Sequence, residues 1–174
     1  MYQHHRKQYL IVTSALIIQC LFFIEGCTYS FKGGSVPAHL KTIAIPIVED
    51  QSGFGDATLR ETFTKQLVDR FVSDNSLQLT DRKSADSMIE GVIIDVKDAP
   101  SVLQGVEQVT ARRITMTVHV TFQDLKLRKK IWEKNFPGWG DYASGSTLTK
   151  RDDGVQIAIQ KITEDILNET VAGW

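Results

Sequence analysis

The sequence contains too little of several residue types to belong to some large classes of protein. Its 174 residues include 2 cysteines, which cannot build a disulfide-rich scaffold or a four-cysteine zinc site. Only 12 Gly and 4 Pro residues are present, too few for a collagen-like or low-complexity chain. Because 21 Asp and Glu residues balance 20 Lys and Arg residues, we expect no nucleic-acid partner. These absences leave a globular chain, long enough for one domain and a leader.

A long apolar run lies near the N-terminus. Arg6 and Lys7 precede residues 10–24, LIVTSALIIQCLFFI. A basic start followed by about 15 apolar residues is typical of a secretory signal, whereas a helix that spans a membrane needs roughly 20. The sequence therefore predicts a signal peptide over residues 1–26, whose removal also removes Cys20.

The residues that follow this run, Ile24-Glu25-Gly26-Cys27, resemble the bacterial lipobox. The resemblance implies cleavage before Cys27 and acylation of Cys27, palmitate included, and two or more acyl chains anchor a protein stably. In lipoproteins an Asp after the Cys signals retention in the inner membrane, so Thr28 implies sorting to the outer membrane. The alternative is an uncleaved N-terminal anchor in which Cys27 is incidental. Residues 27–40 are predicted to form a lipidated tether.

Alternating apolar and polar residues predict the strands of the remaining domain, residues 41–174. The clearest pattern covers residues 112–125, where one face carries Ile114, Met116, Val118, Val120 and Phe122 and the other carries Thr115, Thr117, His119, Thr121 and Gln123. In the predicted strand 88–96, Met88, Val92, Ile94 and Val96 are expected on one face. Further strands are predicted at 41–47, 77–80 and 131–136, with a hairpin turn at 124–130 and a loop at 137–146.

Two segments have the helical spacing of apolar residues, 57–73 and 154–171. The first presents Leu59, Phe63, Leu67, Val68, Phe71 and Val72, and the second presents Val155, Ala158, Ile159, Ile162, Ile166 and Leu167. Two amphipathic helices need an apolar surface to cover, and a strand with one apolar face supplies it. We therefore predict an α+β two-layer sandwich, in which a mainly antiparallel sheet of about four strands carries both helices on one face. The polar face of the sheet is expected to be exposed.

The sequence contains no recognisable catalytic or metal-binding motif. Only His39 and His119 follow the leader, far apart and without acidic or cysteine partners at ligand spacing. No nucleophile elbow, Walker loop or dinucleotide-binding fingerprint is present. Gly53 and Gly55 precede a predicted helix, but the third glycine of a phosphate-binding loop is missing. We therefore predict no enzyme, no metal and no cofactor, and a lipid-anchored hydrolase is the least favoured function.

Positive charge is concentrated at three places despite the neutral total. Four cations lie in the predicted hairpin turn: Lys126, Arg128, Lys129 and Lys130. Arg112 and Arg113 begin the long strand, and are therefore expected at the opposite end of the sheet. Lys150 and Arg151 precede the last helix. Two interpretations remain open: these residues serve solubility and edge protection, or they bind phosphate or carboxylate groups of an anionic lipid.

Taken in order, several segments resemble the LptE family, lipoproteins of lipopolysaccharide transport. The segments are CTYSFKGG at 27–34, VPAHLKTIAIP at 36–46, ADSMIEG at 85–91, RITMTVHVTFQD at 113–124 and IWE at 131–133. The terminal helix fits as well, so the resemblance covers nearly all of the chain after the leader. It implies two helices on a four-stranded sheet, in agreement with the periodicity.

The resemblance also implies a function. LptE-like proteins are non-enzymatic lipoproteins of the Gram-negative outer membrane that plug LptD, a large β-barrel, and help to assemble the translocon that delivers lipopolysaccharide to the outer leaflet. A plug inside one barrel implies a one-to-one complex. Some members also bind lipopolysaccharide through basic residues, and the positions that match best here are Lys150 and, with less correspondence, Arg112 and Arg113. The alternative is a lipid-binding, pilot or adaptor lipoprotein of another envelope complex, such as a secretin.

Overall fold

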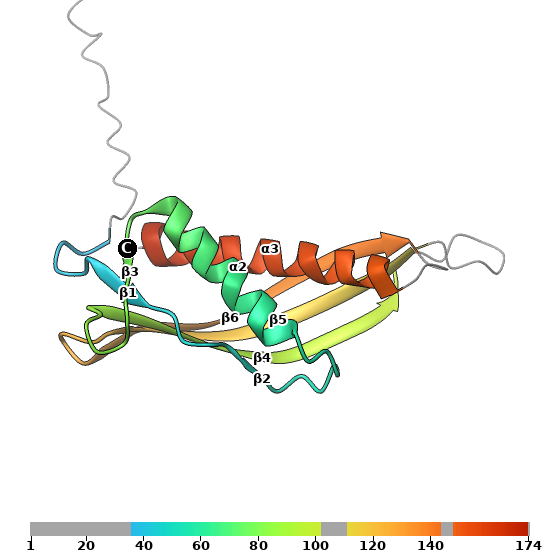
Figure 1. The fold of residues 1–174 in the computed structure, drawn as a ribbon, viewed down its shortest axis with the longest axis horizontal. Helices are drawn as coiled ribbons and strands as arrows, with labels where there is room; N and C mark the ends of the chain where they lie inside the picture. Colours follow the sequence, from blue (N-terminus) through green and yellow to red (C-terminus); the bar gives the residue numbers. More distant parts are fainter. Residues whose placement is uncertain (1–35, 102–110, 144–147, 174) are drawn as a thin grey trace, which may run out of the picture. The chain divides into compact units, whose positions relative to one another are not determined.

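The computed structural model describes residues 36–101, 111–143 and 148–173, without the side chains of residues 148–150. The predicted signal peptide, Cys27 and the first part of the tether lie outside the described residues. The elements, labelled in Figure 1, are β1 (Thr42–Ala44), β2 (Glu49–Asp50), α2 (Leu59–Asp74), β3 (Gln78–Leu79), β4 (Ser87–Pro100), β5 (Ala111–Asp124), β6 (Lys129–Ala143) and α3 (Leu148–Ala172).

The strands form a single mixed sheet with the order β3-β1-β4-β5-β6, and β2 pairs with β4 away from this path. Strand β1 is parallel to both of its neighbours, and β4, β5 and β6 are antiparallel. Both helices lie on the same side of the sheet (Figure 1). The α+β class and the placement of the helices are confirmed, but the prediction of about four, mainly antiparallel strands is wrong. The sheet has six strands and is mixed, because α2 forms a crossover that returns the chain parallel to β1.

The core lies between this sheet and the helices. The apolar face of β5 is fully buried: its five side chains, at every second position from Ile114 to Phe122, are each at most 1% exposed. Helix α2 buries Leu59, Phe63, Leu67 and Phe71, whereas Val72 of the predicted stripe is 58% exposed. Helix α3 buries Val155, Ala158, Ile159, Ile162 and Ile166. We call the side of the sheet that meets the helices the inner face and the other side the outer face.

Strand β6 continues much further than the sequence indicates. Residues 137–143, predicted as a loop, pair with β5 as far as Ala143. The glycines that favoured a loop lie beneath α3: a Cβ on Gly138 would lie 2.4 Å from Cγ1 of Ile162, and one on Gly140 would lie 2.1 Å from the carbonyl oxygen of Gly154. These glycines therefore allow α3 to approach β6 closely, and the strand continues through them.

Strand β4 contains an irregularity that changes which side chains are buried. Its pairing with β5 shifts between Ile93 and Asp95, and such a bulge reverses the alternation of side chains that follows it. Ile89, Ile93 and Val96 consequently belong to the core, while Ile94 is 41% exposed. The predicted single face of Met88, Val92, Ile94 and Val96 is wrong for this reason.

Candidate functional site

The outer face of β5 is polar, as the sequence predicts. Thr115, Thr117, His119 and Thr121 are half-buried, and they alternate with the sealed core residues. His119 is held by two side chains of β6, since its Nδ1 lies 2.7 Å from Oδ1 of Asn135 and its Nε2 lies 2.9 Å from Oε1 of Glu133. Lys130 also donates to Glu133, and these bonds, that of Lys130 first, lower the pKa of Glu133. The face is therefore an ordered polar surface.

A cleft with a volume of about 440 Å³ lies on this face beside His119. Its polar wall includes Thr121 and Glu90, and its apolar wall includes Val92 and Ile47, of which Ile47 is 64% exposed. Single exposed apolar side chains are common on protein surfaces, and Ile47 is one that lies beside polar groups. The outer face thus combines ordered polar groups with a small apolar hollow.

Arg112 faces inward at one end of the sheet. Its Nε donates to Oδ1 of Asp98 at 2.9 Å and to the Tyr142 hydroxyl at 3.0 Å. The hydroxyl in turn donates to both oxygens of Asp98, and Nε of Arg151 lies 3.4 Å from Oδ2 of Asp98. Burial and then the Asp98 bond raise the pKa of Tyr142, and the same carboxylate raises the pKa of Arg112. Asp98 therefore joins β4, β5, β6 and α3.

Arg113 faces outward, because successive residues of a strand point to opposite faces. It binds Asp141 through two bonds, 2.7 Å from Nε to Oδ1 and 2.8 Å from a terminal nitrogen to Oδ2, which lower the pKa of Asp141. Its guanidinium also lies 4.0 Å from the centre of the Trp139 ring, and Nζ of Lys161 lies 3.4 Å from the same centre. Trp139 is thus held by two cations at the free edge of β6.

The predicted lipid-binding residues do not form one patch in the described structure. Arg112 and Arg113 lie on opposite faces and each already binds a carboxylate. Lys150 belongs to the first turn of α3, but its side chain lies outside the described residues. Cys27 also lies outside them. As predicted, the two arginines and the β5–β6 turn occupy opposite ends of the sheet, since Arg112 pairs with Tyr142 and Asp124 with Lys129.

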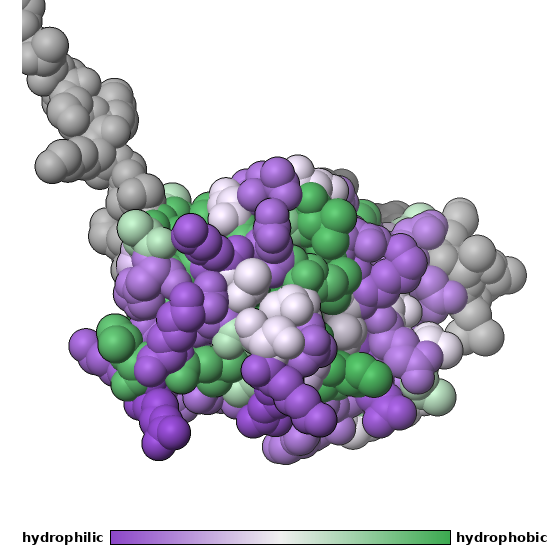
Figure 2. Space-filling view, turned by 60° about the vertical axis from the view of Figure 1, so that its left-hand side comes forward, coloured by the Kyte–Doolittle hydropathy of each residue, from purple (hydrophilic) through white to green (hydrophobic). Residues whose placement is uncertain are grey.

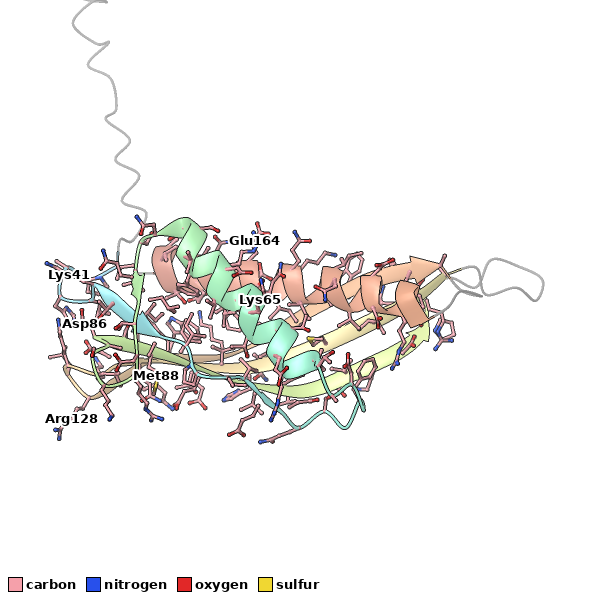
Figure 3. All side chains as sticks on the ribbon, viewed as in Figure 1. Lys41, Lys65, Asp86, Met88, Arg128 and Glu164 are labelled. Carbon is pink, nitrogen blue, oxygen red and sulfur yellow. The ribbon has the colours of Figure 1, made fainter. Side chains whose placement is uncertain are left out.

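The end that holds the β5–β6 turn contains a second carboxylate centre. Asp86 accepts bonds from the amides of Lys41 and Thr42, and its Oδ1 lies 2.7 Å from Nζ of Lys126. These bonds, that of Lys126 first, lower the pKa of Asp86 to about 2. Figure 3 shows Asp86 close to the chain that carries Lys41. The start of the domain is therefore fastened to the hairpin turn through Asp86.

A third carboxylate, Asp124, lies beside this centre and is only 3% exposed. Its Oδ2 lies 2.6 Å from Nε2 of His39, and its Oδ1 accepts the amide of Leu127 at 2.8 Å. Burial raises the pKa of Asp124, but the Leu127 amide and His39 outweigh burial and leave the pKa below its ordinary value. The β5–β6 turn is thus bonded to the start of the domain through both Asp86 and Asp124.

Sequence reasoning did not identify Asp86, Asp98 or Asp124 as structural centres. Each lies close to the end of a strand, where charged residues are common, so the sequence does not distinguish a structural carboxylate from a solvated one. Their partners come from distant segments, because 44 residues separate Asp98 from Tyr142 and 85 separate His39 from Asp124. Only the tertiary structure brings these groups together.

Across residues 36–101, 111–143 and 148–173, no group of three or more His, Cys, Asp or Glu side chains is placed to hold a metal ion. Within the same ranges, no helix has the length and apolar character needed to cross a membrane.

Several solved structures share this fold. Protein CT253 from Chlamydia trachomatis is 15% identical with a TM-score of 0.58, and the match covers 75% of this chain and 95% of CT253. Protein XCC0632 from Xanthomonas campestris is 7% identical with a TM-score of 0.61, over 79% of this chain and 89% of XCC0632. A candidate lipoprotein from Caulobacter crescentus is 14% identical with a TM-score of 0.51, over 73% and 88%. At such identities the likeness concerns the fold alone.

No curated protein matches the sequence. The model of the LptE family, described as lipopolysaccharide-assembly, matches residues 40–170. This range contains all the described helices and strands except the last two residues of α3. The chain therefore belongs to the LptE family of lipopolysaccharide-assembly proteins.

Proposed function

We propose that this protein is a non-enzymatic lipoprotein of the outer membrane, anchored through acylated Cys27. It occupies the lumen of an LptD-type β-barrel and helps to assemble it, in a one-to-one complex that delivers lipopolysaccharide to the outer leaflet. The observation that carries this proposal is the family match over residues 40–170. The lipobox-like Ile24-Glu25-Gly26-Cys27 supports the anchor.

The outer face of the sheet supports the role as a plug. A barrel lumen is polar, and Thr115, Thr117, His119 and Thr121 offer hydroxyl and imidazole groups without a dense net charge. The cleft beside His119 adds a small apolar hollow for a barrel loop. We propose that this face meets the barrel wall.

Lipopolysaccharide contact is assigned to Lys150 first and to Arg112 and Arg113 second. Lys150 is the best positional match to the family's basic residue before the last helix. Arg112 and Arg113 already bind Asp98 and Asp141, so a lipid phosphate has to replace a carboxylate there. We therefore expect Lys150→Glu to reduce lipopolysaccharide binding more than the same change at either arginine.

The proposal is tested by purification from detergent-solubilised outer membranes through a tag after Trp174. The expected result is an LptD-type barrel at one to one and an acylated Cys27, both identified by mass. A secretin in place of the barrel would favour the pilot or adaptor function. If neither the barrel nor a secretin is recovered, the proposed partner is wrong. A Thr117→Arg/Thr121→Arg variant is expected to lose the barrel, whereas Arg60→Glu/Lys65→Glu on α2 is expected to retain it.

A further inference from the structure

The Lys and Arg side chains of the described residues differ in whether they have an interaction partner. Most Lys and Arg side chains pair with a carboxylate or lie against an aromatic ring. Within the described ranges, the side chains that do neither are Lys41, Lys83, Arg128 and Lys129. A charge without a partner keeps its full capacity to attract another ion. The position of these four residues in the fold is therefore informative.

All four lie at the same end of the sheet. Lys41 directly precedes β1, and Lys83 lies in the connection that leads to Asp86 and β4. Arg128 and Lys129 lie where the β5–β6 turn enters β6. The turn is joined to this connection, because the Leu125 amide donates to the carbonyl of Asp86 at 2.8 Å. Figure 3 shows Lys41, Asp86 and Arg128 at this end.

The turn also exposes an apolar side chain. Leu127 is 66% exposed and lies between Lys126 and Arg128. Its amide is bonded to Asp124, and Arg128 adopts the left-handed conformation with φ 51°, so the backbone of the turn is defined. Figure 2, in which this end is turned forward, shows hydrophilic residues with small hydrophobic patches among them. A leucine flanked by cations is suited to the interface of an anionic membrane.

The chain leaves the domain at this end as well. His39 contacts Asp124, and its carbonyl accepts a bond from Nζ of Lys126 at 2.8 Å. Val36 follows Cys27 by nine positions, and an extended chain of that length reaches roughly 30 Å. A lipid anchor on Cys27 thus keeps the four unpaired cations within reach of the bilayer surface.

We propose that this end of the domain, formed by Lys41, Lys83, Leu127, Arg128 and Lys129, docks on the anionic phospholipid surface of the membrane that holds the anchor. The cations contact lipid phosphates, and Leu127 enters the interfacial layer. The inference rests on the lipid anchor of the proposed function and does not require the barrel. Each cation near an anionic surface strengthens binding by about fivefold, and the attraction weakens as salt shortens the Debye length.

The test is amide hydrogen exchange of the purified full chain in vesicles of phosphatidylcholine alone or with phosphatidylglycerol. We expect exchange in peptides that cover residues 124–131 to slow by roughly fivefold or more in the anionic vesicles, and to return to the neutral-vesicle rate in ~0.5 M salt. Arg128→Glu/Lys129→Glu is expected to abolish the slowing, and Leu127→Ser to reduce it. The matched control, Arg60→Glu/Lys65→Glu, makes the same change of charge on α2 and is expected to retain it.

Equal exchange of this turn in neutral and anionic vesicles would overturn the proposal. Slowing that requires added lipopolysaccharide, and does not occur with phosphatidylglycerol, would also overturn it, because the turn would then recognise lipopolysaccharide and not the bilayer surface. Two separate readouts on the same preparation concern the proposed function: the mass of the Cys27 peptide reports acylation, and co-purification reports the barrel. A variant that keeps the barrel but loses the slowing separates the two assignments.

Discussion

The two ends of β5 use positive charge in opposite ways. At the Ala111 end, Arg112 and Arg113 bind Asp98 and Asp141, so their charge joins β5 to β4 and β6. At the Asp124 end, Lys126 binds Asp86 in the same manner, whereas Arg128, two residues further along the chain, pairs with no carboxylate among the described residues. Paired charges position neighbouring elements, while unpaired ones remain available to another molecule. The same residue types therefore build structure at one end and offer a binding surface at the other.

The largest effect that would sharpen this comparison is expected from Gly140→Val near the Ala111 end. A Cβ there would lie 2.1 Å from the carbonyl oxygen of Gly154 and 2.8 Å from Cβ of Ile157. Because these are backbone and Cβ atoms, α3 has to move away from β6, and we expect a loss of about 3 kcal/mol in the free energy of unfolding. Urea unfolding measures it, with Ala99→Val at an exposed position of β4 as control. Equal stability of the two variants would contradict the seating of α3 on this strand.

The next effect concerns the carboxylate that fastens the Asp124 end. The pKa of Asp86 is lowered from 3.8 to about 2, so the folded chain favours its ionised form more strongly than the unfolded chain does. The stabilisation is complete above the ordinary pKa and is lost as the pH falls through about 2. With partial solvent screening, Asp86→Asn is expected to cost about 1–2 kcal/mol at pH 7.

Urea unfolding of wild type and Asp86→Asn between pH 7 and pH 2 measures this effect. The difference between the two proteins is expected to be constant above about pH 5 and to shrink toward zero in acid. Asp69→Asn, which removes an exposed partner of Lys65 on α2, is the control and is expected to cost less stability at pH 7, because exposed ion pairs contribute little. A difference that does not change with pH would show that Asp86 acts through packing and not through its charge.

A smaller effect is expected from Asp98→Ala at the Ala111 end. The change leaves the Tyr142 hydroxyl without the carboxylate to which it donates, and we expect a loss of about 1 kcal/mol in the free energy of unfolding. Asp95→Ala on the same strand removes a carboxylate that is 40% exposed and binds only Lys97 in the described structure, and it is expected to have less effect. If the two variants had the same melting temperature, the bonds of Asp98 would not stabilise the Ala111 end of the sheet.

The smallest loss of stability is expected at Arg128, an unpaired cation of the turn. Arg128→Ala removes no ion pair of the described residues, and arginine and alanine are equally strained in the left-handed conformation, so the free energy of unfolding should change by less than about 0.5 kcal/mol. Arg128→Gly relieves the strain of the positive φ, and a gain of about 1 kcal/mol is expected. A large loss in Arg128→Ala, measured by urea unfolding, would mean that Arg128 is part of the structure, and the contrast between the ends would break.

Elements with long, regular patterns could be predicted from the sequence. The alternation in 112–125 and the helical spacing in 57–73 and 154–171 each predicted an element that the structure contains. The extension of β6 could not be predicted, because Gly138 and Gly140 suggest a loop until α3 is seen to pack on them. Strands β2 and β3 have two residues each, too few to show a period.

The candidate site was predictable only in part. Alternation along β5 predicted the polar face that contains Thr117 and His119. The partners of Arg112 and Arg113 were not predictable, because Asp98 and Asp141 reach them through strand register. The unpaired state of Arg128 also depends on which carboxylates the fold places near the turn. A basic cluster in the sequence does not distinguish a bound cation from a free one.

By itself, the sequence determined the α+β class, the sealed inner face and the polar outer face, because hydrophobic periodicity acts within single elements. The tertiary structure decided the mixed order of the strands, the bulge near Ile93, the seat of α3 on Gly140 and the pairing of each charge. The physical reason is that strand order and ion pairs depend on groups that meet only after chain reversal and packing. Local patterns contain no record of these distant contacts.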